Sequence, residues 1–95
     1  MKQIFAVYDR KIQSVALIKD AESLYDFERW FAITFLTSPT NLFACFPDDF
    51  LVYSLCLFDD EKVEITEDKT LVCADVSEIM DLFKITRPNL ARDPD

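Results

Sequence analysis

The hydrophobic positions of the chain centre on residues 47–60, where an apolar run lies between two pairs of aspartates. An extended conformation places two sets of apolar side chains on opposite faces of this run. One set is Phe50, Val52, Cys56 and Phe58, and the other is Leu51, Tyr53, Leu55 and Leu57. Because both faces are apolar, the pattern predicts an interior β-strand that other elements cover on both sides.

Two further strands are predicted near the N-terminus. Residues 2–8 alternate in a β-branched and aromatic segment, which is typical of a strand. A polar turn at residues 9–11 follows, and residues 12–18 are predicted to pair back as the second strand of a hairpin.

The segment after the central run predicts a return strand. Residues 59–62 form a polar turn, and Val63 and Ile65 then alternate with polar residues, so one face of this strand is expected to be wet. Residues 67–69 predict another turn. Residues 71–74 fit either a short strand or the entry to a final helix.

The clearest helix is predicted over residues 21–36, with Asp20 as its N-cap. Its apolar stripe repeats at helical spacing, and Pro39 disfavours continuation beyond it. Residues 42–46 are expected to be a connector. A C-terminal helix is predicted with Asp75 or Ser77 as its cap. The two stripes are Leu24, Phe27, Phe31 and Phe35, widened by Trp30, Ile33 and Leu36, and then Val76, Ile79, Met80 and Phe83.

These elements predict an α+β fold, with an antiparallel sheet of about four strands, one long amphipathic helix on one face and a short C-terminal helix. The chain has 95 residues, of which 51% are hydrophobic, which fits one compact domain. We place this domain at residues 1–85. Residues 86–95, with two prolines among polar neighbours, are predicted to be a flexible tail.

Charge is distributed unevenly along the chain, whose net charge is −8. Residues 1–47 carry five acids and five bases, whereas residues 48–81 carry eleven acids and two bases. Such an acidic surface argues against nonspecific binding to duplex DNA. It serves either solubility, which is the simpler explanation, or docking to a basic protein.

Several kinds of chemistry lack their usual residues. The chain has no His and no Gly, and its three cysteines are widely spaced, so zinc motifs, thiol–imidazole pairs and glycine-rich phosphate loops are not expected. The cysteines are expected to be free thiols. Tight turns that need a positive φ are expected to use Asn or Asp, for which Asn41 and the aspartate pairs are the candidates, or else to be longer. We therefore predict no enzymatic activity, no cofactor and no metal site.

Three blocks of the sequence resemble a known family. They are Tyr8-Asp9-Arg10-Lys11, Arg29-Trp30-Phe31, and Pro47-Asp48-Asp49-Phe50 followed by Tyr53-Ser54-Leu55 and Phe58-Asp59-Asp60. In order and spacing they resemble the small nonstructural protein of gokushovirus-type microviruses, which are single-stranded DNA bacteriophages. The resemblance covers about residues 1–83. It departs where that family often has Gly, at Cys56 and in the hairpin after Asp60.

The resemblance implies a non-enzymatic protein of the host bacterial cytoplasm that acts in viral single-stranded DNA synthesis or couples it to packaging. We expect no membrane association. Its partners would be the phage replication initiator or procapsid proteins. On the charge pattern, the candidate protein-binding residues are Asp59, Asp60, Glu61 and Glu64.

Three alternatives remain open at this stage. The first is single-stranded DNA binding, for which the candidate residues are Lys2, Tyr8, Arg10 and Lys11, although aromatic residues at helical spacing are more simply core. The second is an acidic DNA mimic that occupies a basic groove of a host factor. A homodimer through edge strands or helix faces is also plausible.

Overall fold

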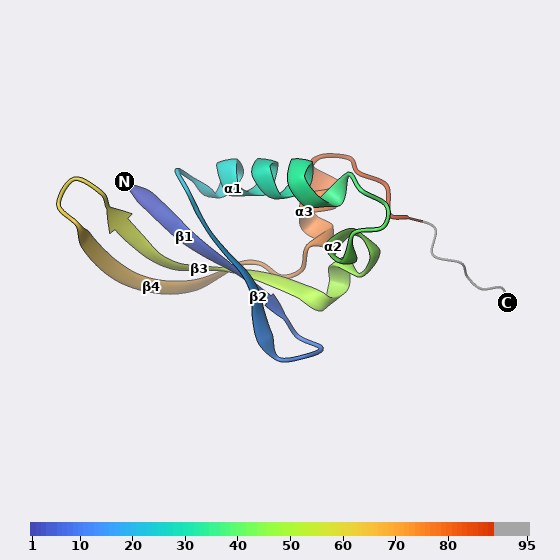
Figure 1. Cartoon of the computed structure of the whole chain (residues 1–95), viewed down its shortest axis with the longest axis horizontal. Helices are drawn as coiled ribbons and strands as arrows, with labels where there is room; N and C mark the ends of the chain where they lie inside the picture. Colours follow the sequence, from blue (N-terminus) through green and yellow to red (C-terminus); the bar gives the residue numbers. More distant parts are fainter. Residues whose placement is uncertain (89–95) are drawn as a thin grey trace, which may run out of the picture.

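A computed structural model describes residues 1–88 of the chain and shows a four-stranded antiparallel sheet with helices packed on one face (Figure 1). The strands are β1 (Lys2–Asp9), β2 (Ser14–Ala21), β3 (Phe50–Asp59) and β4 (Glu64–Cys73), in the sheet order β2-β1-β3-β4. The predicted α+β class is confirmed. Most of the predicted tail, residues 89–95, lies outside the described residues.

The predicted long helix forms as α1 (Leu24–Phe31), which continues directly into a π-helical turn over Ala32–Leu36. The predicted N-cap is wrong. The Ser23 side chain caps α1 by accepting a hydrogen bond from the Asp26 amide at 3.2 Å. Asp20 instead lies in β2, where the strand continues to Ala21 and leaves no room for an earlier helix start.

Two shorter helices complete the helical layer. The expected connector contains α2 (Leu42–Cys45), and its Asn41 side chain accepts a hydrogen bond from the Phe43 amide at 2.9 Å. The C-terminal helix forms as α3 (Ser77–Leu82). Asp75 contributes to its start, because its carboxylate accepts a hydrogen bond from the Ser77 amide at 2.9 Å.

The core lies between the helices and the covered face of β1 and β3. Phe5, Val7 and Val52 from the strands are fully buried there, as are Phe27 and Phe31 from α1. The Phe5 and Phe27 rings stack with their centroids 4.8 Å apart, which joins the sheet directly to α1. The apolar stripe predicted from sequence therefore packs on the sheet as expected, except for Ile33, which is 66% exposed.

The expectation that β3 is covered on both sides is wrong. β3 is an interior strand, but its Phe50 and Val52 face the helical core while Leu51, Tyr53 and Leu55 on the other face are only half-buried. All helices of the described chain lie along one side of the sheet (Figure 1). The sequence shows that both faces are apolar, but it does not show whether anything covers them.

The outer strands differ from their predicted bounds. β2 begins at Ser14 rather than at residue 12, and the loop that joins it to β1 is correspondingly longer than expected. β4 continues through residues 67–69, which were predicted to form a turn, although its pairing with β3 shifts register there, between Thr70 and Glu67. An edge strand that is exposed along most of its length tolerates such a polar run, because neither face of it has to be buried there.

The two hairpin loops are built alike. In each, the last aspartate of the first strand accepts a hydrogen bond from the amide two residues later, at 2.9 Å for Asp9 and at 3.0 Å for Asp59. The residue before the second strand then has a positive φ, 55° at Gln13 and 56° at Val63. The prediction that Asn41 or an aspartate would take this conformation is therefore wrong.

Candidate functional site

The four acidic residues predicted to contact a protein lie together at the end of the β3–β4 hairpin. Asp59 ends β3, Asp60 and Glu61 lie in the loop, and Glu64 begins β4 directly opposite Asp59. The Asp59 carboxylate holds the loop through its bonds to two backbone amides, so its first role is structural. We call residues 59–64 the acidic tip.

The acidic tip is accessible to a partner. The amino group of Met1 lies 3.5 Å from an Asp60 carboxylate oxygen, and both groups are largely exposed. β4 is exposed at every residue from Glu64 to Leu71, and it carries two more acids in this stretch, Glu67 and Asp68. The hairpin therefore presents dense negative charge that no described element shields (Figure 1).

The four residues proposed for DNA contact are not one cluster. Tyr8, Arg10 and Lys11 lie at the end of β1, whereas Lys2 lies at its start. The Lys2 ammonium pairs there with Asp20 at 3.3 Å, and its hydrogen bond lowers the pKa of that carboxyl. A DNA-binding surface at the end of β1 would therefore include Tyr8, Arg10 and Lys11 but not Lys2.

Arg10 is partly committed to the fold. Its guanidinium donates a hydrogen bond to the Ala74 carbonyl at 3.0 Å, and its amide donates to the Asp49 carbonyl at 2.9 Å. These bonds tie the β1–β2 loop to the segments that flank β3 and β4. Among the predicted bases of this loop, Lys11 is the one whose ammonium has no protein partner within the described residues.

Tyr8 lies beside a second tyrosine on the face of the sheet away from the helices. The Tyr8 and Tyr53 rings meet edge to face with centroids 6.5 Å apart, and the Lys69 ammonium lies 5.2 Å from the Tyr53 centroid. A hollow of about 450 Å³ lies over them, lined also by Ala6, Val15 and Leu55.

This face of the sheet is strongly apolar. By register, Ile18 stands opposite Ala6, and Leu71 stands opposite Tyr53, so both belong to the same face as the tyrosines. Val15 is 49% exposed, Ile18 60% and Leu71 48%. We call this surface the open face, formed by Ala6, Tyr8, Val15, Ile18, Leu51, Tyr53, Leu55 and Leu71.

Sequence reasoning missed the open face. The alternation in β3 identified Leu51, Tyr53 and Leu55 as one face, but it assigned that face to the interior. The signal for exposure is the shortage of helices: the chain has one long amphipathic helix, which can cover only one side of a four-stranded sheet.

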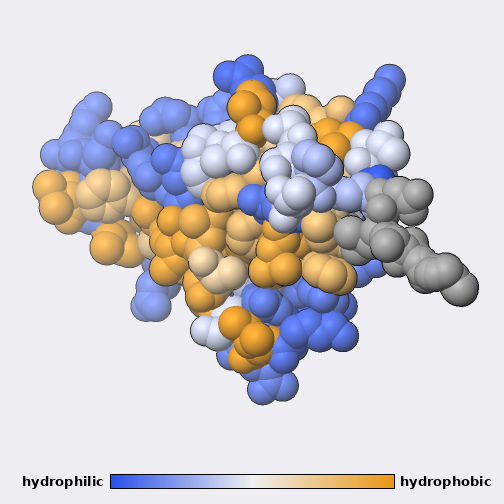
Figure 2. Space-filling model, turned by 45° about the vertical axis from the view of Figure 1, so that its right-hand side comes forward, coloured by the Kyte–Doolittle hydropathy of each residue, from blue (hydrophilic) through white to orange (hydrophobic). Residues whose placement is uncertain are grey.

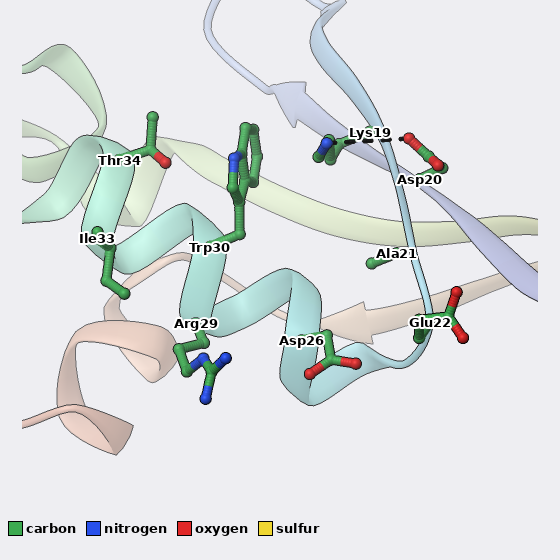
Figure 3. A pocket seen from close by; sticks show the side chains of 9 residues that line it. All are labelled: Lys19, Asp20, Ala21, Glu22, Asp26, Arg29, Trp30, Ile33 and Thr34. Carbon is green, nitrogen blue, oxygen red and sulfur yellow. Dashed lines mark ion pairs between the residues drawn. The ribbon is translucent and has the colours of Figure 1, made fainter.

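A second hollow, of about 420 Å³, lies between β2 and α1 (Figure 3). The Lys19 ammonium lies 5.0 Å from the centroid of the Trp30 ring and 3.9 Å from an Asp20 oxygen. Arg29 and Asp26 point to the side away from Trp30 (Figure 3). Apart from the Lys19–Asp20 ion pair, the charged groups diverge, so the hollow does not direct an acid and a base at a common point.

One buried thiol and one shifted carboxyl lie between α1 and α3. The Cys73 thiol donates a hydrogen bond to the Asp75 carbonyl at 2.8 Å, and burial, followed by the charge of Glu78, raises its pKa to about 12. Burial and the same Glu78 raise the pKa of Glu28. The Cys73 thiol therefore stays protonated, and it is a poor nucleophile.

Two further observations bear on the class of protein. Within residues 1–88, no three side chains of His, Cys, Asp or Glu come together as a possible metal site. None of the helices in this part of the chain is long and apolar enough to cross a membrane.

Comparison with known proteins decides the family. The family model described as Phage ORF5 protein matches residues 2–79, which include all four strands and α1. The chain belongs to the Phage ORF5 protein family. The comparisons with curated proteins and with solved structures found no match. The match fixes a phage protein family, and in this Phage ORF5 protein it spans both the acidic tip and the open face.

Proposed function

We propose that this Phage ORF5 protein is a non-enzymatic factor of the host cytoplasm that acts in viral single-stranded DNA synthesis or couples it to packaging. It would do so by contacting the phage replication initiator or procapsid proteins through the acidic tip. The resemblance to gokushovirus-type nonstructural proteins supports the process, and the family match supports the phage setting.

The observation that most strongly supports this proposed contact is the exposed acidic hairpin. Asp60, Glu61 and Glu64 gather at one end of the sheet, and the β4 stretch beyond them is exposed to Leu71. Opposed charge speeds encounter with a basic partner and orients it, which an exposed hairpin achieves without burying charge. A purely solubilising role does not require acids to be concentrated on one projecting element.

Affinity capture from phage-infected cells tests this proposal. The tagged protein is compared with an acidic-tip variant, Asp60→Lys with Glu61→Lys. The matched control is Glu22→Lys with Asp26→Lys, which reverses two exposed acids near α1 and changes the net charge equally.

We expect the unaltered protein and the control to retain a phage replication or assembly protein, and the acidic-tip variant to lose it. Capture should weaken as salt is raised, because the charges are exposed. If no phage protein is recovered, or if both variants lose it equally, the proposal fails. Recovery of a host DNA-binding protein, released by competing DNA, would instead favour a DNA mimic.

Single-stranded DNA binding is the second candidate, and the Tyr8–Tyr53 pair with Lys69 favours it. Aromatic rings on the central strands of a sheet can stack bases while nearby cations contact phosphates. Fluorescence anisotropy with a labelled oligonucleotide at low salt tests it. The Tyr53→Ala and Lys69→Ala variants should both weaken binding, and no binding by the unaltered protein removes the candidate.

A further inference from the structure

We infer that the open face is the contact surface of a homodimer, in which the sheets of two copies pack face to face. This inference does not depend on the proposed function, since it uses neither the acidic tip nor a phage partner. It rests on the composition of the open face, on its size and on its charge.

The composition of the open face is that of an interface. Ile18 and Leu71, on the two outer strands, and Tyr53 between them belong to one continuous sheet surface. Contiguous apolar patches of this kind are rare on soluble monomers and mark contact sites. Hydrophobic residues also form a broad area across the middle of the face drawn in Figure 2, with hydrophilic residues above and below it.

The size of the open face suits a second copy. Four strands spaced about 4.8 Å apart and about eight residues long give a face of roughly 19 Å by 26 Å, or about 500 Å² in flat projection. A stable interface buries about 800 Å² of accessible surface on each partner. The open face therefore approaches the lower end of stable interfaces, about 600 Å² per partner, and the charged side chains at its margin add accessible area to it.

The charge of the open face is also compatible with a second copy of the chain as the partner. Lys2 and Asp20 pair with each other at its margin, and on the outer strand β4 Glu67 stands opposite Cys56 while the Lys69 ammonium lies over the Tyr53 ring. Two bases thus balance two acids on a chain whose net charge is −8. Two open faces can therefore meet without local repulsion between like charges.

Face-to-face packing also explains why the open face can remain apolar. Two sheets pack about 10 Å apart with their strands roughly aligned, and the side chains of the facing surfaces interdigitate. The half-buried Tyr8 and Tyr53 would then lie near the centre of the interface, where aromatic residues contribute most. The hollow of about 450 Å³ beside them would accept side chains of the partner.

Sedimentation equilibrium over a concentration series tests the inference. The decisive variant is Ile18→Lys, on the open face. The matched control is Ile33→Lys on the helical side, because the substitution is identical and the exposed fractions are similar, 60% and 66%. Urea unfolding shows that each variant is folded.

We expect the unaltered protein to dimerise, and Ile18→Lys to raise the dissociation constant at least about tenfold, since it places an unpaired ammonium in the interface. The Ile33→Lys control should leave the dissociation constant unchanged. Added salt should not weaken the dimer, which separates it from contacts of the acidic tip.

Other outcomes overturn the inference. A protein that stays monomeric throughout the series has no such interface. A dimer that both variants retain uses edge strands or helices instead. If the protein is monomeric and binds an oligonucleotide, and the Ile18→Lys variant does not bind it, the open face is a nucleic-acid-binding surface instead.

Discussion

The loop between β3 and β4 holds a valine where the backbone favours another residue. Val63 has φ of 56°, in the left-handed region. That conformation costs an L-residue roughly 1–2 kcal/mol, and a β-branched side chain lies at the unfavourable end. In a chain without glycine, the loop of the acidic tip is therefore closed at a cost in stability. The family that the sequence resembles often has Gly in this hairpin.

Val63→Asn should stabilise the protein. Asparagine accepts positive φ more readily and avoids the entropic cost of glycine. Val63 is 76% exposed, so about a quarter of its side chain is buried, worth about 0.4–0.7 kcal/mol. Subtracting that loss from the relieved strain leaves a gain of about 0.3–1.6 kcal/mol in the free energy of unfolding. For a domain of this size, that is an increase of about 1–13 °C in Tm.

The measurement is urea unfolding followed by fluorescence of Trp30, the single tryptophan, which packs against Phe27, Phe31 and Phe35. The control is Ile65→Asn, because Ile65 is 66% exposed but lies within β4. Asparagine disfavours strands, so this variant should lose up to about 1 kcal/mol. If Val63→Asn lost as much stability as Ile65→Asn, the conclusion that Val63 strains the loop would be wrong.

The remaining predictions concern the core and the titrating groups. Phe31→Ala should destabilise the protein by about 3–5 kcal/mol in urea unfolding, because the fully buried ring contacts four other aromatic rings. Unchanged stability would contradict the placement of Phe31 in the core. Cys73 should resist a thiol reagent at neutral pH in the native protein, while the partly exposed Cys45 and Cys56 react; peptide mapping identifies the labelled residues. The raised pKa of Glu28 means that the native state binds more protons than the unfolded state above the usual value of 4.5, so this group lowers stability as pH rises. Glu28→Gln should flatten that decline and increase stability at neutral pH, and a pH series of unfolding midpoints checks it.

Much of the fold was predictable because its signals are local. The spacing of Leu24, Phe27 and Phe31 predicts α1 on any reading of helical periodicity, and the alternation in residues 2–8 predicts β1. One error arises where two residues compete for one role. Asp20 and Ser23 are both good caps, and the choice between them depends on how far β2 pairs with β1, which is a tertiary matter.

Only part of the candidate site could be predicted from the sequence. Turn composition placed Asp59, Asp60 and Glu61 at a hairpin end, and the structure brings them together there. Pairing of distant strands creates the open face, where residues as far apart as Val15 and Lys69 line one hollow. No window of sequence contains both, so periodicity alone does not reveal that they share a surface.

The exposure of β4 from Glu64 to Leu71 has a consequence for how the chain can evolve. The fully buried side chains of the described chain come from the three α-helices, from β1, from the first half of β3, and from Pro47 and Val76 beside these elements, with none from the acidic tip. Substitutions at the tip therefore touch no core contact, and they can accumulate without threatening the folded body. The sequence of this hairpin can therefore diverge while the rest of the domain stays intact.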